Sequence, residues 1–326
     1  MGKGGLTEKL FHGVIPALVT PFTEAGDLDH VAIVKLVEHH IAAGVNGLYV
    51  CGSTGEGMSM TVSERKEMLS VTCAAAAGRI PVMVMVGACP LEDALELTRH
   101  ADTSGAAAIS TVAPGAYSWI EADAPDLKGC VHFFNAVASA STLPFYPYWL
   151  GTLAGGVSAR SFLMAMRDVP RFAGLKYTPR DLYIFQQLID LAPSILGRRL
   201  NMLSGPDECH IAACAMGADG AIGSTYNLMP QLFLKMRAAF ESGAHTEALA
   251  LQARANRVID ALLTHTRCDV RGTHIVAGIK AAMRELQQVE AAGFGRAATR
   301  SDTCPWTAKE EMALLSDLRA LDFAIA

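Results

Sequence analysis

The chain has 326 residues, a formal net charge of −5 at pH 7 and 51% hydrophobic residues. This length and apolar content suit a single large α/β domain with an ample core. The mildly acidic balance argues against nucleic acid or a membrane surface as partners, because neither attracts a negatively charged protein.

The remaining bulk features point to an ordinary intracellular protein. The N-terminal segment lacks the apolar stretch of a secretory signal, and no apolar run is long enough to span a bilayer. The eight cysteines form no CxxC pair, and the ten histidines show no metal-ligand spacing. We therefore expect a cytoplasmic protein with reduced thiols and no metal.

Short apolar runs alternate with helical patterns in units of roughly 30 residues. The predicted strands are Val14–Thr20, Gly47–Cys51, Pro81–Val86, Ala106–Val112, Pro144–Trp149, Phe172–Tyr177, Asn201–Ser204 and Gly220–Ser224. The helices predicted after them are Leu28–Ala43, Thr61–Ala77, Leu91–Thr103, Ala124–Ser139, Ser158–Arg167, Asp181–Leu191, Glu208–Met216 and Pro230–Ser242. Thr61 and Glu64 form a capping-box pattern at the second helix.

Eight strand–helix units predict a closed parallel (β/α)8 TIM barrel over residues 10–243. A doubly wound sheet is the alternative, but neither GxGxxG nor GK[ST] follows any strand. Three more helices are expected over Thr246–Leu263, His274–Glu290 and Thr307–Asp322. Residues 244–326 are thus predicted to pack on the barrel as a C-terminal helical extension, not as an independent domain.

Lys176 is the first candidate for chemistry. It lies inside the apolar strand Phe172–Tyr177, whereas the other eight lysines lie in polar, helical or terminal contexts. Burial lowers the pKa of an amine and frees its lone pair to attack a carbonyl. The alternative is a strand-end lysine that extends to solvent, and position alone does not decide between the two.

Polar residues at other strand ends add candidates, since barrels place their sites there. The loop Gly52–Glu56 offers converging backbone N–H groups and the hydroxyls of Ser53 and Thr54, which suit a carboxylate or phosphate. Tyr148 ends the fifth strand and can relay protons, or it is a core aromatic. Pro147 beside it removes a ladder donor, so we expect a local irregularity there.

Two further segments close the candidate set. Gly205-Pro-Asp207-Glu208 ends the seventh strand, where the acids either bind sugar hydroxyls or only cap the next helix. Gly223-Ser-Thr-Tyr-Asn227 ends the eighth strand, a usual place for contacts to an oxygen-rich ligand.

Together these segments resemble the N-acetylneuraminate lyase and dihydrodipicolinate synthase family of pyruvate-dependent class I aldolases. The matching pieces are Gly13–Phe22, Gly52–Glu56, the strand ending at Tyr148, Gly174-Leu-Lys176 and Met216–Gly220. Within the family the chain is most similar to the sialic acid lyase branch, through Gly55–Gly57 with Val62–Arg65, Asp207-Glu208 and Gly223–Asn227. The synthase branch has an arginine where this chain has Leu153.

The resemblance implies a reaction and the residues that carry it. Lys176 would form an imine with the C2 carbonyl of pyruvate or of the open-chain sugar acid, and Tyr148 would shuttle the proton of the C4 hydroxyl. Ser53 and Thr54 would hold the pyruvyl carboxylate. The expected reaction is reversible cleavage of N-acetylneuraminate to N-acetylmannosamine and pyruvate, with no cofactor beyond the covalent imine.

The resemblance also implies a sugar pocket and an assembly. Thr178 would shape the pocket beside Lys176. The residues expected to bind the polyhydroxylated tail are Gly205, Asp207, Glu208 and Ser224. Relatives are usually homotetramers, so we expect one here.

Two departures from the family pattern concern substrate choice. The segment Tyr148–Leu153 carries Trp149, Gly151 and Thr152 in place of the lyases' usual residues, so we expect a reshaped sugar pocket. The family has a tyrosine after the fourth strand that reaches into the neighbouring subunit. This chain has Ala116 at that position, with Tyr117 next to it. Alternatives are therefore an aldolase for another 2-keto-3-deoxy sugar acid, a dihydrodipicolinate-synthase-like enzyme, or a non-catalytic barrel that binds a small carboxylate.

Overall fold

The computed structural model describes residues 10–112, 127–150, 157–266, 274–285, 300 and 307–321. One sheet of parallel strands runs in the order β1-β8-β7-β6-β5-β4-β3-β2. The strands are β1 (Gly13–Pro16), β2 (Leu48–Val50), β3 (Val82–Met85), β4 (Ala108–Val112), β5 (Phe145–Trp149), β6 (Gly174–Tyr177), β7 (Asn201–Ser204) and β8 (Gly220–Gly223). The N–H of Leu18 donates to the carbonyl of Tyr49 at 2.8 Å and joins the β1 and β2 edges. The chain is a (β/α)8 TIM barrel, as the alternating pattern predicted.

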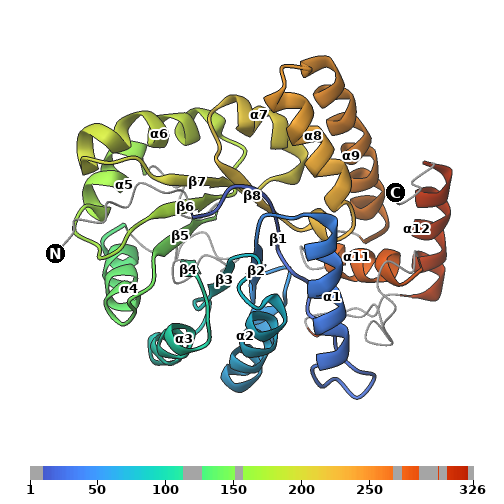
Figure 1. The fold of residues 1–326 in the computed structure, drawn as a ribbon, viewed down its shortest axis with the longest axis horizontal. Coiled ribbons are helices and arrows are strands. Elements are labelled where there is room, and N and C mark those ends of the chain that lie inside the picture. The colour runs from blue at the N-terminus through green and yellow to red at the C-terminus, as the bar shows by residue number, and fades with distance from the viewer. Residues whose placement is uncertain are drawn as a thin grey trace.

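A helix follows each strand and covers the outside of the barrel (Figure 1). The helices are α1 (His30–Ala43), α2 (Val62–Ala76), α3 (Leu91–Thr103), α4 (Leu127–Ser139), α5 (Ala159–Met166), α6 (Leu182–Leu196), α7 (His210–Ala215) and α8 (Pro230–Glu241). Short 3-10 turns η1 (Gly57–Ser59), η4 (Asp207–Cys209) and η5 (Thr225–Asn227) lie at strand ends. In the part of the chain that the structure describes, no helix has the length and apolarity to cross a membrane.

The C-terminal helices α9 (His245–Thr266), α11 (His274–Glu285) and α12 (Ala308–Ala320) gather beside α8 (Figure 1). Helix α9 packs against α8, α11 and α12, and α11 also contacts η5 at the end of β8. The extension therefore reaches the carboxyl ends of the strands, where a barrel carries its site.

Most predicted boundaries hold to within a few residues, and α6 differs most. It continues through Pro193 to Leu196, whereas the sequence predicted an end at Leu191. The buried side chains of Ala192 and Ile195 keep the last turn on the barrel, and Gly197 caps it in the left-handed conformation. The capping box of Thr61 and Glu64 is present as predicted.

Pro147 interrupts the pairing of β5 with β6. Phe145 pairs with Phe172 and Tyr148 pairs with Lys176, so two residues of β5 lie opposite three of β6. This is a β-bulge, which the missing N–H of proline favours and which commonly redirects side chains near active sites. The predicted irregularity is confirmed, and it lies directly before Lys176.

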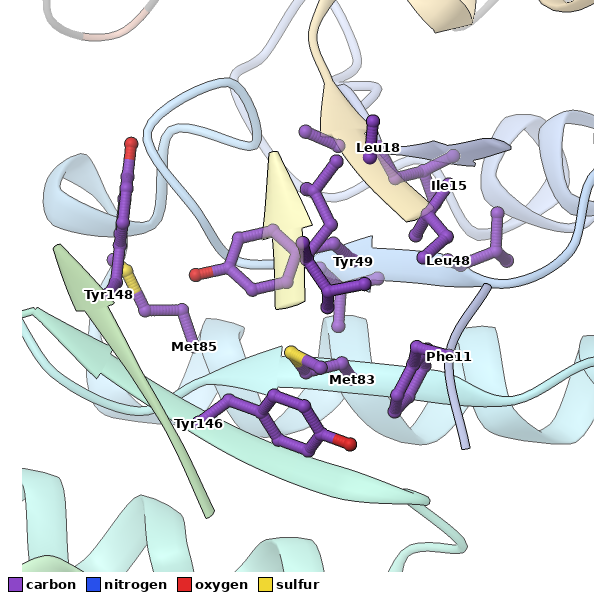
Figure 2. Packing of buried hydrophobic residues seen from close by; sticks show 14 of the residues in the cluster. Phe11, Ile15, Leu18, Leu48, Tyr49, Met83, Met85, Tyr146 and Tyr148 are labelled. Atoms are coloured by element: carbon purple, nitrogen blue, oxygen red, sulfur yellow. The ribbon is translucent and has the colours of Figure 1, made fainter. Parts of the chain in front are cut away.

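The barrel interior is sealed at its amino-terminal end. Phe11 and Tyr146 pack edge to face with ring centroids 5.7 Å apart. Asn201 holds both residues, since its Oδ1 accepts from the Phe11 N–H and the Tyr146 hydroxyl. Figure 2 shows these rings apart from Tyr148, which lies at the carboxyl end of β5. Among the described residues, these contacts fill the amino-terminal end of the interior, and the carboxyl end is where a barrel binds its ligand.

Candidate active site

Lys176 points into the barrel from β6 and is 6% exposed. Burial lowers the pKa of its amine to about 7, and the charge of Asp207 opposes that shift. A large share of the amine is therefore neutral at physiological pH, as a nucleophile requires. The alternative of a lysine that extends to solvent is wrong, because the barrel wall encloses the side chain.

Two tyrosine rings flank this amine. The Nζ atom of Lys176 lies 4.2 Å from the ring centroid of Tyr148 and 4.2 Å from that of Tyr49. Figure 2 shows both rings projecting into the barrel interior. Burial raises the pKa of Tyr148, while the hydroxyls of Thr178 and Ser53 oppose that shift. The phenol is thus protonated at neutral pH and adjoins two hydroxyls that can pass a proton on.

The loop between β2 and η1 brings Ser53 and Thr54 to the same end of the barrel. Thr54 Oγ1 lies 2.7 Å from Oγ of Ser224, which follows β8. The loop needs left-handed backbone at Cys51 (φ 58°) and Glu56 (φ 56°), a conformation that non-glycine residues adopt at a cost. A hydroxyl cluster from two separate strand ends is therefore held in a strained backbone.

The two carboxylate oxygens of buried Asp207 differ in their hydrogen bonding. Its Oδ2 accepts from the N–H and the hydroxyl of Thr225 at 2.8 and 2.7 Å. Its Oδ1 has no partner among the described residues, and a Cβ added at Gly223 would lie 2.0 Å from it. Burial raises the pKa of Asp207 to about 6, against the bonds from Thr225. An unpaired buried acceptor of this kind suits a ligand hydroxyl.

A cavity of about 560 Å³ is lined by Asp207 and Ser224, whereas Lys176, Tyr148, Ser53 and Thr54 are not among its lining residues. The predicted residues that line it are Thr178, Gly205, Asp207, Glu208 and Ser224. Helices α9 and α11 supply another part of the wall, including Asn256 and Ile275. The cavity has the size of a small-molecule site.

Glu208 and Arg180 lie at the rim of this cavity. The guanidinium of Arg180 donates to Oε1 of Glu208 from Nε at 2.7 Å, and its Nη2 lies 2.6 Å from the same oxygen. The Arg180 side chain is 74% exposed. The sequence did not single out Arg180, since an arginine in a turn is ordinarily a solvated residue.

Trp149 corrects one expectation about the pocket. The side chain is buried on the helix side of the sheet, with its ring 4.7 Å from Phe162 and 5.6 Å from Tyr177. Strand alternation explains this, because Tyr148 faces inward and its neighbour must face outward. Its bulk therefore does not reshape the cavity. The other departures, Gly151, Thr152, Leu153, Ala116 and Tyr117, lie outside the described residues.

Three buried groups were missed or misjudged from sequence. Tyr49 looked like an ordinary strand residue, yet it flanks the Lys176 amine. Lys280, expected in a polar helical context, is 2% exposed and pairs with buried Glu56. His40, which the sequence did not single out, is fully buried, and burial lowers its pKa to about 3. No group of three His, Cys, Asp or Glu able to hold a metal occurs within the described ranges.

Residues 10–307 match the sequence model of the Dihydrodipicolinate synthetase family. The chain belongs to this family. It is 36% identical over 251 residues to the N-acetylneuraminate lyase of Rhizobium meliloti (strain 1021). The aligned region covers 77% of this chain and 80% of that protein.

Solved structures of two sialic acid aldolases share this fold. The N-acetylneuraminate lyase (sialic acid aldolase) of Aliivibrio salmonicida matches with a TM-score of 0.83 and 30% identity, over 97% of this chain and 98% of that one. A catalytic lysine mutant of the Ruminococcus gnavus sialic acid aldolase matches with a TM-score of 0.82 and 27% identity, over 96% of both chains. With its family and with lyases as relatives, the chain is a carbon–carbon lyase.

Proposed function

We propose that the protein is a class I aldolase that reversibly cleaves N-acetylneuraminate to N-acetylmannosamine and pyruvate through an imine at Lys176. The observation that carries the proposal is the buried Lys176 amine, whose pKa burial lowers to about 7, between the rings of Tyr148 and Tyr49. It is supported by a 36% identical N-acetylneuraminate lyase and by the catalytic lysine of a sialic acid aldolase with this fold.

The chemistry follows from a neutral amine beside a phenol. The Lys176 amine adds to the C2 carbonyl, and loss of water gives a protonated imine. Tyr148 takes the C4 hydroxyl proton while its own proton passes to the Ser53 hydroxyl, which in turn gives its proton to the bound carboxylate of the substrate; an equivalent proton is later delivered to C3. The C3–C4 bond then breaks, its electron pair moves to the imine nitrogen, and the aldehyde leaves. Protonation of the enamine at C3 and hydrolysis of the imine release pyruvate and regenerate the amine.

The remaining residues bind the two ends of the substrate. Ser53 and Thr54 hold the pyruvyl carboxylate, and Thr178 shapes the pocket beside the imine. Gly205, Asp207, Glu208 and Ser224 line the cavity that receives the sugar tail. The imine is itself the electron sink, so the proposed reaction uses no metal or organic cofactor. We propose further that the protein acts in the cytoplasm as a homotetramer.

An aldolase for another 2-keto-3-deoxy sugar acid is the second candidate, favoured by one observation. The guanidinium of Arg180 donates a hydrogen bond to Glu208, a residue expected to bind the sugar. The cavity rim therefore presents a guanidinium beside the carboxylate, which changes the polar groups that a sugar would meet.

Product analysis separates the two candidates. Purified protein is incubated with N-acetylneuraminate or with a 2-keto-3-deoxy hexonate that lacks the acetamido group, and the aldehyde and pyruvate are quantified. Equal amounts of N-acetylmannosamine and pyruvate, absent with Lys176→Ala, support the first candidate. Cleavage of the hexonate alone supports the second. Cleavage of neither, by a folded protein, contradicts both.

A further inference from the structure

Glu56 ends the loop that carries Ser53 and Thr54, and its carboxylate is buried. Oε1 bonds to Nζ of Lys280 on α11, and Oε2 accepts the backbone N–H of Arg300 at 2.7 Å. The side chains of Glu56 and Lys280 are each 2% exposed. The C-terminal extension therefore contacts the loop through a charge pair that is closed to solvent.

The ion pair of Glu56 and Lys280 lies beside the ring of Phe22 and the side chain of Arg300. Nζ of Lys280 lies 4.9 Å from the ring centroid of Phe22, and the Arg300 guanidinium lies 4.1 Å from the same centroid. Nη1 of Arg300 also lies 2.7 Å from Oε1 of Glu64 in the first turn of α2. The loop is thus fixed at its carboxyl end to α11, and Arg300 links α2 to the same cluster.

The loop has a reason to need this support. Glu56 has φ 56°, and the loop turns so closely that a Cβ at Gly57 would lie 2.0 Å from the Cys51 carbonyl oxygen. Left-handed backbone at a non-glycine residue persists only where its surroundings enforce it. A buried ion pair is in itself a weak source of stability, because desolvation offsets the attraction. The buried Glu56–Lys280 pair is therefore better explained by the backbone shape that it enforces in the loop than by a contribution to the free energy of unfolding.

We propose that Glu56 and Lys280 are positioning residues that hold the loop of Ser53 and Thr54 in the shape that binds the pyruvyl carboxylate. Neither residue touches the substrate. Helix α11 also supplies Ile275 to the cavity wall, so one helix would set both the carboxylate loop and part of the sugar pocket. This inference rests on the proposed function for its ligand, but the loop geometry can be tested without it.

The kinetic test uses Lys280→Met, which keeps the length of the side chain and removes its charge. In the condensation direction we expect the KM for pyruvate to rise at least tenfold, because the loop loses its shape. The KM for N-acetylmannosamine should stay within about twofold, and the pH at which the Lys176 amine becomes reactive should not move. An unchanged pyruvate KM, or an equal loss for both substrates, overturns the proposal.

Two further variants make this result specific. Glu285→Gln changes the same helix but removes an exposed ion pair with Arg319, so it should leave both KM values unchanged. The double variant Glu56→Gln with Lys280→Met leaves no unpaired buried charge, and we expect it to fold and to show the same weak pyruvate binding. If neither Lys280 variant folds, the pair is a folding requirement and the positioning role is wrong.

Hydrogen exchange tests the loop itself. We expect amide exchange in the peptide covering residues 51–60 to accelerate at least tenfold in Lys280→Met, with no change in strand β6 and none in Glu285→Gln. Unchanged exchange in the loop contradicts the proposal whatever the enzyme's substrate is. Failure of the wild-type protein to bind pyruvate, with the exchange result as expected, would instead overturn the proposed function alone.

Discussion

Burial controls the ionisation of the Lys176 amine, and one carboxylate limits the effect. Burial lowers its pKa to about 7, and Asp207 opposes that shift. An ammonium has no lone pair, so imine formation needs the deprotonated amine. The pH dependence of imine formation therefore reports directly on this side chain.

We expect the rate of imine formation with pyruvate to rise with pH, to be half-maximal near pH 7 and to level off above it. To measure this rate, the imine is trapped with cyanoborohydride at a series of pH values, and the fraction of protein that carries the reduced adduct is followed by intact-mass spectrometry. A half-maximal point near the ordinary lysine pKa of 10.5 would show an exposed amine and contradict the burial.

Asp207→Asn should move that half-maximal point below pH 7. The Asp207 carboxylate stabilises the ammonium form, so its removal lowers the pKa of Lys176 further. The same trapping series measures the shift with pyruvate alone, which keeps sugar binding out of the result. Asp260→Asn, at the cavity wall, is the control and should leave the point in place. A shift to higher pH in Asp207→Asn would reverse the assigned sign.

Tyr148→Phe should separate imine formation from cleavage. In the proposed mechanism the phenol moves the C4 proton, and positioned acid–base groups contribute roughly 100-fold or more to such steps. We expect cleavage of N-acetylneuraminate to fall by about that factor, as measured by pyruvate release, while trapping of pyruvate on Lys176 continues. Cleavage within about threefold of wild type would remove Tyr148 from the mechanism.

At the scale of elements, strand periodicity and the strand ends made much of the site predictable. An apolar strand interrupted by one lysine identified Lys176, and Pro147 indicated the irregularity beside it. Inward and outward alternation also determines that Tyr148 faces the barrel interior and Trp149 does not. That consequence was available from the sequence, and it would have corrected the expectation for Trp149.

Contacts between distant segments were not predictable in the same way. Lys280 lies on an amphipathic helix, and only the fold shows that it meets Glu56, 224 residues away. The bond between Thr54 and Ser224 joins two loops across 170 residues. No local pattern encodes such pairs, because they depend on which strand ends the closed barrel brings together.

The β6–α6 turn carries Arg180, whose exposed pair with Glu208 fixes the carboxylate at the cavity rim. Arg180→Ala should raise the KM for N-acetylneuraminate by about fivefold, or roughly 1 kcal/mol, because Glu208 loses its orientation. The free energy of unfolding should change by less than about 1 kcal/mol, as for other exposed pairs. Steady-state kinetics and urea unfolding check both.

Arg319→Ala removes a comparable exposed pair on α12 and is the matched control, expected to leave the KM unchanged. If Arg180→Ala alters pyruvate binding equally, Arg180 does not act on the sugar end.

On the scale of the whole molecule, the buried amine costs stability. Lowering its pKa from 10.5 to about 7 makes the unfolded state bind the proton more tightly. At pH 7 this penalty is roughly 4 kcal/mol, since a tenfold change in proton affinity is 1.36 kcal/mol. The penalty shrinks as pH rises toward 10.5, where both states lose the proton.

Lys176→Met should therefore unfold with a higher free energy than the wild type at pH 7, by up to about 4 kcal/mol. The difference should narrow as the pH rises toward 10. Urea unfolding at pH 7 and pH 9 measures both values. A destabilised Lys176→Met protein, or a difference that does not depend on pH, would contradict the penalty assigned to the amine.

One measurement tests the central claim most directly: intact mass and peptide mapping after pyruvate and borohydride are added to the protein. The imine mechanism predicts a single reduced pyruvate adduct, located on Lys176, that is lost in Lys176→Ala and retained in Tyr148→Phe. A folded wild-type protein that gains no adduct, or gains it on another lysine such as Lys280, would contradict the assignment of Lys176 as the nucleophile.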